Sequence, residues 1–207
     1  MKKIISILLV LCVLFALGAC KGNSDDATTK TTIPNPDITP ISIDDSTITD
    51  YLDNCAYFGR CNWNDFTTDE QRAISEKARQ IGAELNVSDD GAIKITDQSG
   101  IIITYGCTWP RDNHLIKSFP IPEGKKVAYV YEKTGVLCYV ATYMTMDEAK
   151  AYAKNLADLG FTKGVTETEN EKTYYYDAEK EDGTLMSLVV FEAGITLIGV
   201  LPVETGN

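Results

Sequence analysis

The fold of this chain is constrained most by a series of short segments that alternate apolar and polar residues and are separated by tight-turn sequences. Lys126–Glu132 and Val136–Met144, for example, flank the turn sequence Thr134-Gly135. A period of two is typical of a strand with one buried face, and short turns that contain Gly join antiparallel neighbours. The pattern therefore predicts a mostly antiparallel sheet.

Three stretches carry helix signals instead. In the first, a Ser cap at Ser46 precedes apolar residues at helical spacing: Ile48, Tyr51, Leu52 and Cys55. Thr67–Gln71 contains two capping-box registers, and Ile74, Ala78 and Ile81 then fall on one helix face, which we expect to be buried. The segment 145–160 has a similar cap and apolar stripe. Read in chain order, the sequence predicts helices near 46–55, at 67–82 and at 145–160, and strands at 84–87, 92–96, 101–105, 126–132, 136–144, 172–178, 184–192 and 195–203.

This order predicts an α+β fold in which a helix covers each sheet or half-sheet: an αβββ unit followed by a ββαβββ half. A connector rich in Pro, 109–122, separates the two parts, and we expect Trp109, Leu115, Ile116 and Phe119 to pin it to a core. The domain prediction is therefore a small subdomain at 51–106 and a domain at 107–207.

The N-terminus carries a secretion signal. Met1-Lys2-Lys3 is a positive start, and an apolar run follows that is too short for a comfortable membrane span. The run ends in Leu17-Gly18-Ala19-Cys20. This ending resembles the lipobox of bacterial lipoproteins, and the resemblance implies that residues 1–19 are a signal peptide and that Cys20 is lipidated. The protein would then be anchored by acyl chains to the outer side of the cell membrane.

Residues 20–50 read as a lipid-anchored disordered tether, because they are rich in Thr, Ser, Asp and Pro and contain no aromatic residue. The whole chain has 30 acidic residues against 19 Lys and Arg, a net charge of −11. This charge disfavours nucleic acid and anionic headgroups as partners. Membrane contact should therefore come from the acyl anchor alone.

Four cysteines lie beyond Cys20. In an exported chain they predict two disulfides, Cys55–Cys61 by their short spacing and Cys107–Cys138 by elimination. Four free or buried thiols are the alternative. The sequence has no Cys-x-x-Cys pair and one histidine, so we expect no metal site and no cofactor.

Catalytic signatures are absent from the sequence, and we assign no catalytic residue. His114 is the only imidazole, so a Ser-His-Asp or Cys-His mechanism would have to use it. With 30 acidic residues in the chain, some carboxylates must lie close together, so a carboxylate pair does not by itself indicate a glycosidase. Residues 86–97 resemble a calcium-binding loop, but a hairpin turn at Asp89-Asp90-Gly91 is the better interpretation because no helix follows.

Tyrosines supply the candidate binding surface. Tyr129 and Tyr131 share one face of a predicted strand, and Tyr139 and Tyr143 share one face of the next. Aromatic pairs also stabilise ordinary sheets, so this pattern alone leaves a purely structural role open. If the rings are exposed, they are suited to a peptide, a glycan or an envelope protein.

In layout the chain resembles uncharacterised small lipoproteins of low-GC Gram-positive bacteria. We therefore expect a cell-envelope lipoprotein that acts as a non-catalytic binding module for an extracellular ligand or partner. Two alternatives stay open. The helix-plus-meander unit resembles PepSY-type inhibitory modules, and a hydrolase could act through His114 or a carboxylate pair.

Overall fold

The structure, a computed structural model, describes residues 40–44, 46–191 and 194–201. The expected signal peptide, Cys20 and most of the expected tether lie outside these residues. The described elements are α2 (Ile48–Tyr57), the 3₁₀ turn η1 (Trp63–Asp65), α3 (Thr68–Gln80), β1 (Glu84–Val87), β2 (Ile93–Thr96), β3 (Ile101–Tyr105), β4 (Tyr129–Lys133), β5 (Leu137–Tyr143), α4 (Met146–Asp158), β6 (Lys163–Glu169), β7 (Thr173–Glu179), β8 (Leu185–Phe191) and β9 (Ile195–Leu201).

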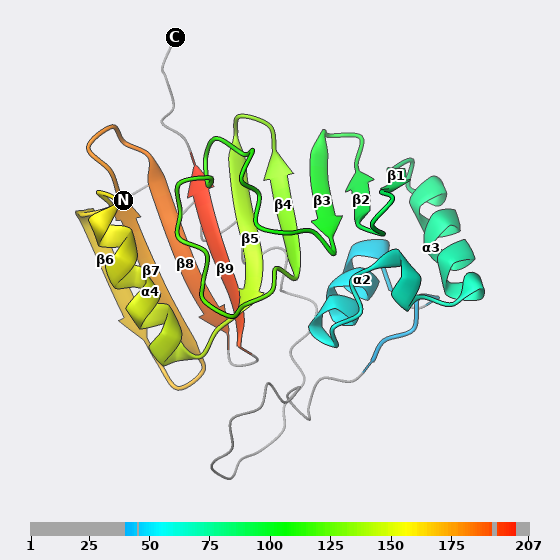
Figure 1. Cartoon of the computed structure of the whole chain (residues 1–207), viewed down its shortest axis with the longest axis horizontal. Helices are drawn as coiled ribbons and strands as arrows, with labels where there is room; N and C mark the ends of the chain where they lie inside the picture. Colours follow the sequence, from blue (N-terminus) through cyan, green and yellow to red (C-terminus); the bar gives the residue numbers. More distant parts are fainter. Residues whose placement is uncertain (1–39, 45, 192–193, 202–207) are drawn as a thin grey trace. The chain divides into compact units, whose positions relative to one another are not determined.

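The strands form one open antiparallel sheet in the order β1-β2-β3-β4-β5-β9-β8-β7-β6 (Figure 1). The first five strands follow chain order. After α4 the chain continues at the far edge with β6 and returns strand by strand, so that β9 pairs with β5. The predicted α+β class and antiparallel sheet are therefore confirmed.

Strand β6 is the element that the sequence does not predict. All seven of its residues, Lys163 to Glu169, are exposed, and it pairs only with β7 at the sheet edge. With neither face buried, the segment has no apolar alternation to recognise. Its Lys, Thr and Glu side chains suit an edge strand that must avoid pairing with other chains. The second half is thus ββαββββ instead of ββαβββ.

The predicted boundary near 106–107 falls inside this sheet. β3 and β4 pair along five residues, from Ile101 opposite Lys133 to Tyr105 opposite Tyr129. The connector runs from the end of β3 to the start of β4, which pairs with β3. Trp109, Ile116 and Phe119 are buried, as predicted, and Leu115 is half-buried.

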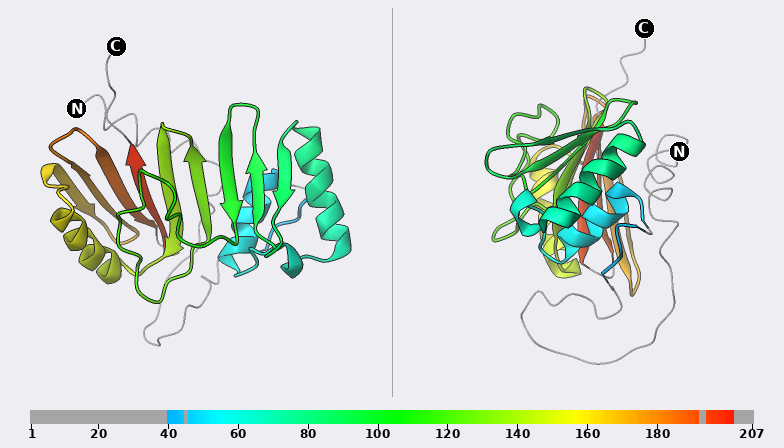
Figure 2. Two further views of the ribbon diagram at one scale, coloured as in Figure 1. Left: turned by 45° about the horizontal axis from the view of Figure 1, so that its top comes forward. Right: turned by 90° about the vertical axis from the view of Figure 1, so that its right-hand side faces the viewer.

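Helices cover the two faces of the sheet at different places. The connector and α4 pack on the face that carries Val130, Val140 and Ile198, which we call the α4 face. The opposite side chains of the same strands, among them Tyr105 and Tyr129, define the α2 face, because neighbouring residues of a strand alternate. In the left view of Figure 2, α4 and the connector lie in front of the sheet and α2 lies behind it.

Helices α2 and α3 pack against the α2 face of the sheet. Leu52, Ala56, Ile74 and Ala78 are buried, together with Ile93 and Ile95 of β2. The sequence predictions for these helices need two corrections. The cap of α2 is Thr47, whose side chain accepts from the Asp50 N–H, and not Ser46. Ile81 is 56% exposed because α3 ends before it. Helix α2 starts at Ile48, so its first residues lie inside the range 20–50 that is predicted as a tether.

Candidate functional site

Five tyrosines gather on the α2 face of three neighbouring strands, and we call them the tyrosine cluster. They are Tyr105 on β3, Tyr129 and Tyr131 on β4, and Tyr139 and Tyr143 on β5. Tyr131 and Tyr139 are register partners whose rings stack at 4.6 Å with an angle of 6°. Tyr105 and Tyr129 are also partners, with ring centroids 5.6 Å apart.

The four tyrosines predicted to bind a ligand differ in accessibility. Tyr129 and Tyr139 are each 8% exposed, whereas Tyr131 and Tyr143 are half-buried. The connector and α4 lie on the opposite face, so neither of them covers the cluster. Tyr131 and Tyr143 therefore keep part of their surface accessible, whereas Tyr129 and Tyr139 are almost fully covered.

Asp53 joins the cluster from α2. The Tyr105 hydroxyl donates a hydrogen bond of 2.6 Å to its carboxylate. One helical turn further on, Tyr57 meets Tyr143 edge to face, with ring centroids 5.8 Å apart. A single face of α2 thus supplies both a carboxylate and an aromatic ring to the tyrosine cluster.

The electrostatics of Asp53 are unusual for a carboxylate. Burial raises its pKa to about 7; the hydrogen bond from Tyr105 lowers the pKa, and the neighbouring Asp50 raises it. The pKa of Tyr105 lies well above its ordinary value, because of burial first and the Asp53 charge second. The pair therefore carries at most one negative charge at neutral pH, and Asp53 can both accept and release a proton there.

The sequence gives little signal for Asp53. It occupies a polar position within a helix, and its partner Tyr105 lies 52 residues away. The one available hint is the i, i+4 spacing of Asp53 and Tyr57 beside a buried stripe. Such a spacing is also typical of solvent-exposed helix faces.

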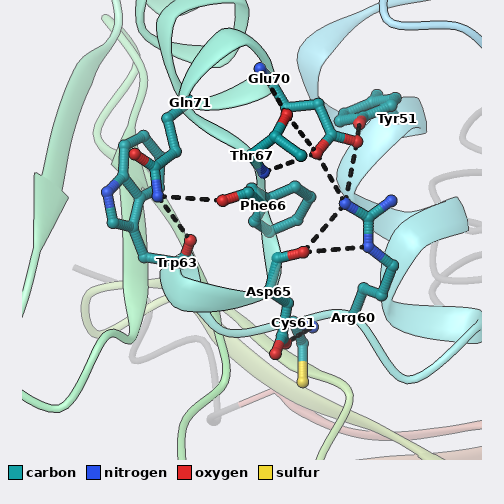
Figure 3. A network of polar contacts seen from close by, with 9 residues as sticks. All are labelled: Tyr51, Arg60, Cys61, Trp63, Asp65, Phe66, Thr67, Glu70 and Gln71. Atoms are coloured by element: carbon teal, nitrogen blue, oxygen red, sulfur yellow. Dashed lines mark hydrogen bonds and ion pairs between the residues drawn. The ribbon is translucent and has the colours of Figure 1, made fainter.

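A polar network holds α2 against the start of α3 (Figure 3). Arg60 donates two hydrogen bonds, of 2.8 and 2.9 Å, to the Glu70 carboxylate. The Tyr51 hydroxyl donates to the same carboxylate at 3.0 Å, and the Thr67 N–H donates at 2.7 Å in the helix cap. The Arg60 guanidinium also lies 4.8 Å from the centre of the Phe66 ring.

This network is structural in character. Partial burial alone would raise the pKa of Glu70, but the hydrogen bonds from Arg60 and Thr67 prevail and lower it to about 2. Glu70 thus stays ionised across the physiological range, and each of its oxygens is already engaged by the helix cap or by α2. The network fixes the position of α2, and with it the meeting of Asp53 and Tyr105.

The predicted disulfides are not formed in the structure. Cys55, Cys61, Cys107 and Cys138 all carry free thiols; Cys55 and Cys138 are buried, and the other two are half-buried. Burial raises the pKa of Cys107 to about 11 and that of Cys138 to about 12. These two thiols are therefore protonated at neutral pH, which makes them poor nucleophiles.

The other sequence candidates are not assembled into a site. His114 is exposed on the connector, and no contact among the described residues joins it to Cys107 or to a carboxylate. Residues 88–92 form the predicted hairpin turn, closed by the Ser88 N–H on the Ala92 carbonyl at 3.0 Å. In the part of the chain that the structure covers, no three His, Cys, Asp or Glu residues are arranged to hold a metal ion.

Within the described ranges, no helix has the length and apolar character needed to cross a membrane. We compared the chain with protein-family models, with curated proteins and with solved structures. None of these comparisons found a match.

Proposed function

We propose that this protein is a cell-envelope lipoprotein whose body is a non-catalytic binding module for an extracellular peptide, glycan or protein partner. Acyl chains on Cys20 would hold it at the outer side of the cell membrane. The support for the anchor is the short charged and apolar start of the chain, which ends in Leu17-Gly18-Ala19-Cys20. The support for the binding surface comes from the tyrosine cluster.

The observation that carries the binding proposal is Asp53 within this cluster. A carboxyl group with a raised pKa destabilises the folded state at neutral pH, and a hydrophobic or amide side chain would avoid this. Groups held at such an energetic disadvantage concentrate at functional sites. Here the group is hydrogen-bonded to Tyr105 of the cluster, and its charge also acts on the half-buried Tyr143.

The geometry of the cluster also indicates the kind of ligand. The stack with Tyr139 covers one ring face of Tyr131, which is half-buried and so keeps part of its surface for a partner. Tyr rings combine apolar contact area with a hydrogen-bonding tip, which suits peptide backbones and the hydroxyl groups of sugars. The net charge of −11 disfavours anionic ligands.

Capture from envelope extracts tests this proposal. The full chain is immobilised and compared with Tyr131→Phe, Tyr143→Phe and Tyr131→Ser/Tyr143→Ser variants. We expect the double Ser variant to lose at least about tenfold in affinity, the effect of one aromatic hot spot, while the Phe variants lose less. Tyr175→Ser is the matched control, since Tyr175 is also half-buried but lies on β7, about 19 Å from β4.

An unchanged set of captured ligands in the double variant would refute the assignment of the surface. Melting curves of all variants separate lost binding from lost folding. If the Phe variants, which keep the rings, melt far below the wild type, the cluster is core and the proposal is wrong.

The anchor has its own test. Cys20→Ala should abolish both membrane retention and labelling by a fatty-acid probe, because the thioether bond to the lipid cannot form. Cys55→Ser is the control and should keep both properties. A wild-type protein that takes up no label would contradict the proposed lipidation.

One observation favours a second candidate function, a hydrolase that uses Asp53. A pKa of about 7 is well matched to general acid catalysis at neutral pH, and Asp50 lies one helical turn away as a second carboxylate. Asp50, however, is hydrogen-bonded to the Thr47 hydroxyl at 2.6 Å. Turnover of glycan or ester substrates that disappears in Asp53→Asn would favour the hydrolase over the binding module.

A further inference from the structure

Cys61 lies in close contact with the end of β3. Gly106, the residue before Cys107, has a φ of +68°, and a Cβ atom at this position would lie 2.7 Å from the Cys61 carbonyl oxygen. The same atom would lie 3.5 Å from the Cα of Asn62. Only glycine permits this approach, which brings the backbones of the two cysteine-bearing segments together.

Several hydrogen bonds hold the Cys61 segment in place. Asn62 forms a β-bridge with Ala92, and its side chain donates to the Asp90 carbonyl at 2.7 Å. Trp63 donates its N–H to the Gly91 carbonyl, also at 2.7 Å. Because Ile93 of β2 pairs with Tyr105 of β3, this anchoring fixes the segment against the residues that follow β3.

The electrostatics of Cys61 and Cys107 add to this contact between the two backbones. Cys61 accepts a hydrogen bond from the Gly106 N–H, although burial is what mainly determines its raised pKa. After burial, the charge on Cys61 is one of the causes that raise the pKa of Cys107. Cys55 points elsewhere, because its thiol interacts with the Tyr51 hydroxyl and with Arg60 and Glu70. Cys61 lies beyond Arg60 in Figure 3, where its backbone N–H donates a hydrogen bond of 3.1 Å to the Asp65 carboxylate.

We propose that Cys61 and Cys107 form a disulfide when the protein is oxidised, and that neither Cys55–Cys61 nor Cys107–Cys138 does. Cys107 has two neighbouring thiols, since its charge also affects Cys138. Cys138, however, is completely buried in the core on the α4 face of β5, whereas Cys61 and Cys107 are both half-buried. An oxidant can therefore reach the Cys61–Cys107 pair without opening the core.

The chemistry is thiol–disulfide exchange. The Cys61 thiol loses its proton and attacks an oxidised disulfide, either a small-molecule disulfide or that of an oxidoreductase; a mixed disulfide forms and one sulfur of the oxidant leaves as a thiolate. Cys107, which is protonated at rest, then gives up its proton and attacks the Cys61 sulfur of the mixed disulfide, which expels the second sulfur of the oxidant. One S–S bond forms in the protein, and the two thiol protons and two electrons end on the oxidant, which is reduced to two thiols. The product links the segment after α2 to the end of β3, beside the tyrosine cluster.

Peptide mapping of the full chain tests the pairing. The purified protein is incubated with oxidised glutathione, its remaining thiols are alkylated, and it is digested with trypsin without reduction. Trypsin places each of the four cysteines beyond Cys20 in a different peptide: 31–60 for Cys55, 61–72 for Cys61, 95–111 for Cys107 and 134–150 for Cys138.

We expect peptides 61–72 and 95–111 to be linked in the wild type and in the Cys55→Ser and Cys138→Ser variants. Cys61→Ser and Cys107→Ser should each free the partner for alkylation, and circular dichroism checks that both fold. A link from 31–60 to 61–72, or from 95–111 to 134–150, would overturn the proposal. So would complete alkylation of all four thiols after oxidation.

Discussion

Replacing Asp53 with Asn probes the group on which the candidate site depends. The substitution removes the carboxylate charge but keeps a side-chain oxygen that can accept the 2.6 Å hydrogen bond from Tyr105. Size and shape are nearly unchanged, so packing against the tyrosine cluster should be preserved. Any change in stability therefore reports on the buried charge.

The sign and size of the effect follow from the pKa. The ordinary pKa is 3.8 and the folded-state value is about 7, so between these pH values the folded state holds a proton that the unfolded chain has lost. This contribution to stability is fully present below pH 3.8 and is lost as the pH rises through 7. At about 1.4 kcal/mol per pH unit the upper bound is about 4 kcal/mol. The half-buried side chain still reaches water, so we expect about 1–3 kcal/mol.

Denaturant unfolding at pH 4 and pH 8 measures this difference. Asp53→Asn should nearly match the wild type at pH 4, where both side chains are neutral in the folded state, and should be more stable by about 1–3 kcal/mol at pH 8. Tyr105→Phe is the companion variant. It removes the hydrogen-bond donor that lowers the pKa of Asp53, so the pH-dependent loss of folding stability should move to higher pH. A difference between Asp53→Asn and wild type that is the same at both pH values would refute the reasoning.

Two further predictions concern the helical layer. Glu70→Ala should lower the free energy of unfolding by about 1–2 kcal/mol at pH 7, because it removes a helix cap and the ion pair with Arg60. The control Glu76→Ala, at an exposed position, should lower it by less than about 0.5 kcal/mol. Since the pKa of Glu70 is lowered to about 2, this stabilisation is present above pH 4.5 and is lost as the pH falls through 2; urea titration at pH 2 and 7 checks both statements. Ile74→Ala should cost about 2–5 kcal/mol and Ile81→Ala under about 0.5 kcal/mol, because the first side chain is fully buried and the second exposed; thermal melts that rank them equally would contradict the fold.

Much of the fold could be predicted because its signals are local. Thr145 and Glu148 form the predicted capping box of α4, and the hairpin of β4 and β5 turns at the predicted Thr134-Gly135. Strand β6 could not be predicted because its side chains are exposed on both faces, so only its backbone pairing with β7 defines it as a strand. A partner strand of this kind leaves no pattern in its own sequence.

The site was less predictable because it depends on tertiary contacts. The tyrosines of β4 and β5 could be placed on shared strand faces from alternation alone, but which of them are buried depends on neighbours from α2 and β3. Asp53 looks like an ordinary helix residue until Tyr105 is brought to it. The short spacing of Cys55 and Cys61 does not show their surroundings either: the Cys55 thiol interacts with Tyr51, whereas Cys61 lies against the backbone at Gly106.

Site-specific photo-crosslinking in living cells tests the central claim most directly. A photoreactive phenylalanine derivative is placed at position 131 or 143 of the full-length, exported protein, and at 175 as the control, and adducts are detected by mass spectrometry after irradiation. If the protein is a binding module, the photoreactive residue at position 131 or 143 should give a discrete adduct, and the one at position 175 should give none. An excess of unlabelled wild-type protein should reduce the yield of the adduct. Equal adduct patterns at all three positions, or no adduct from either cluster position, would contradict the central claim.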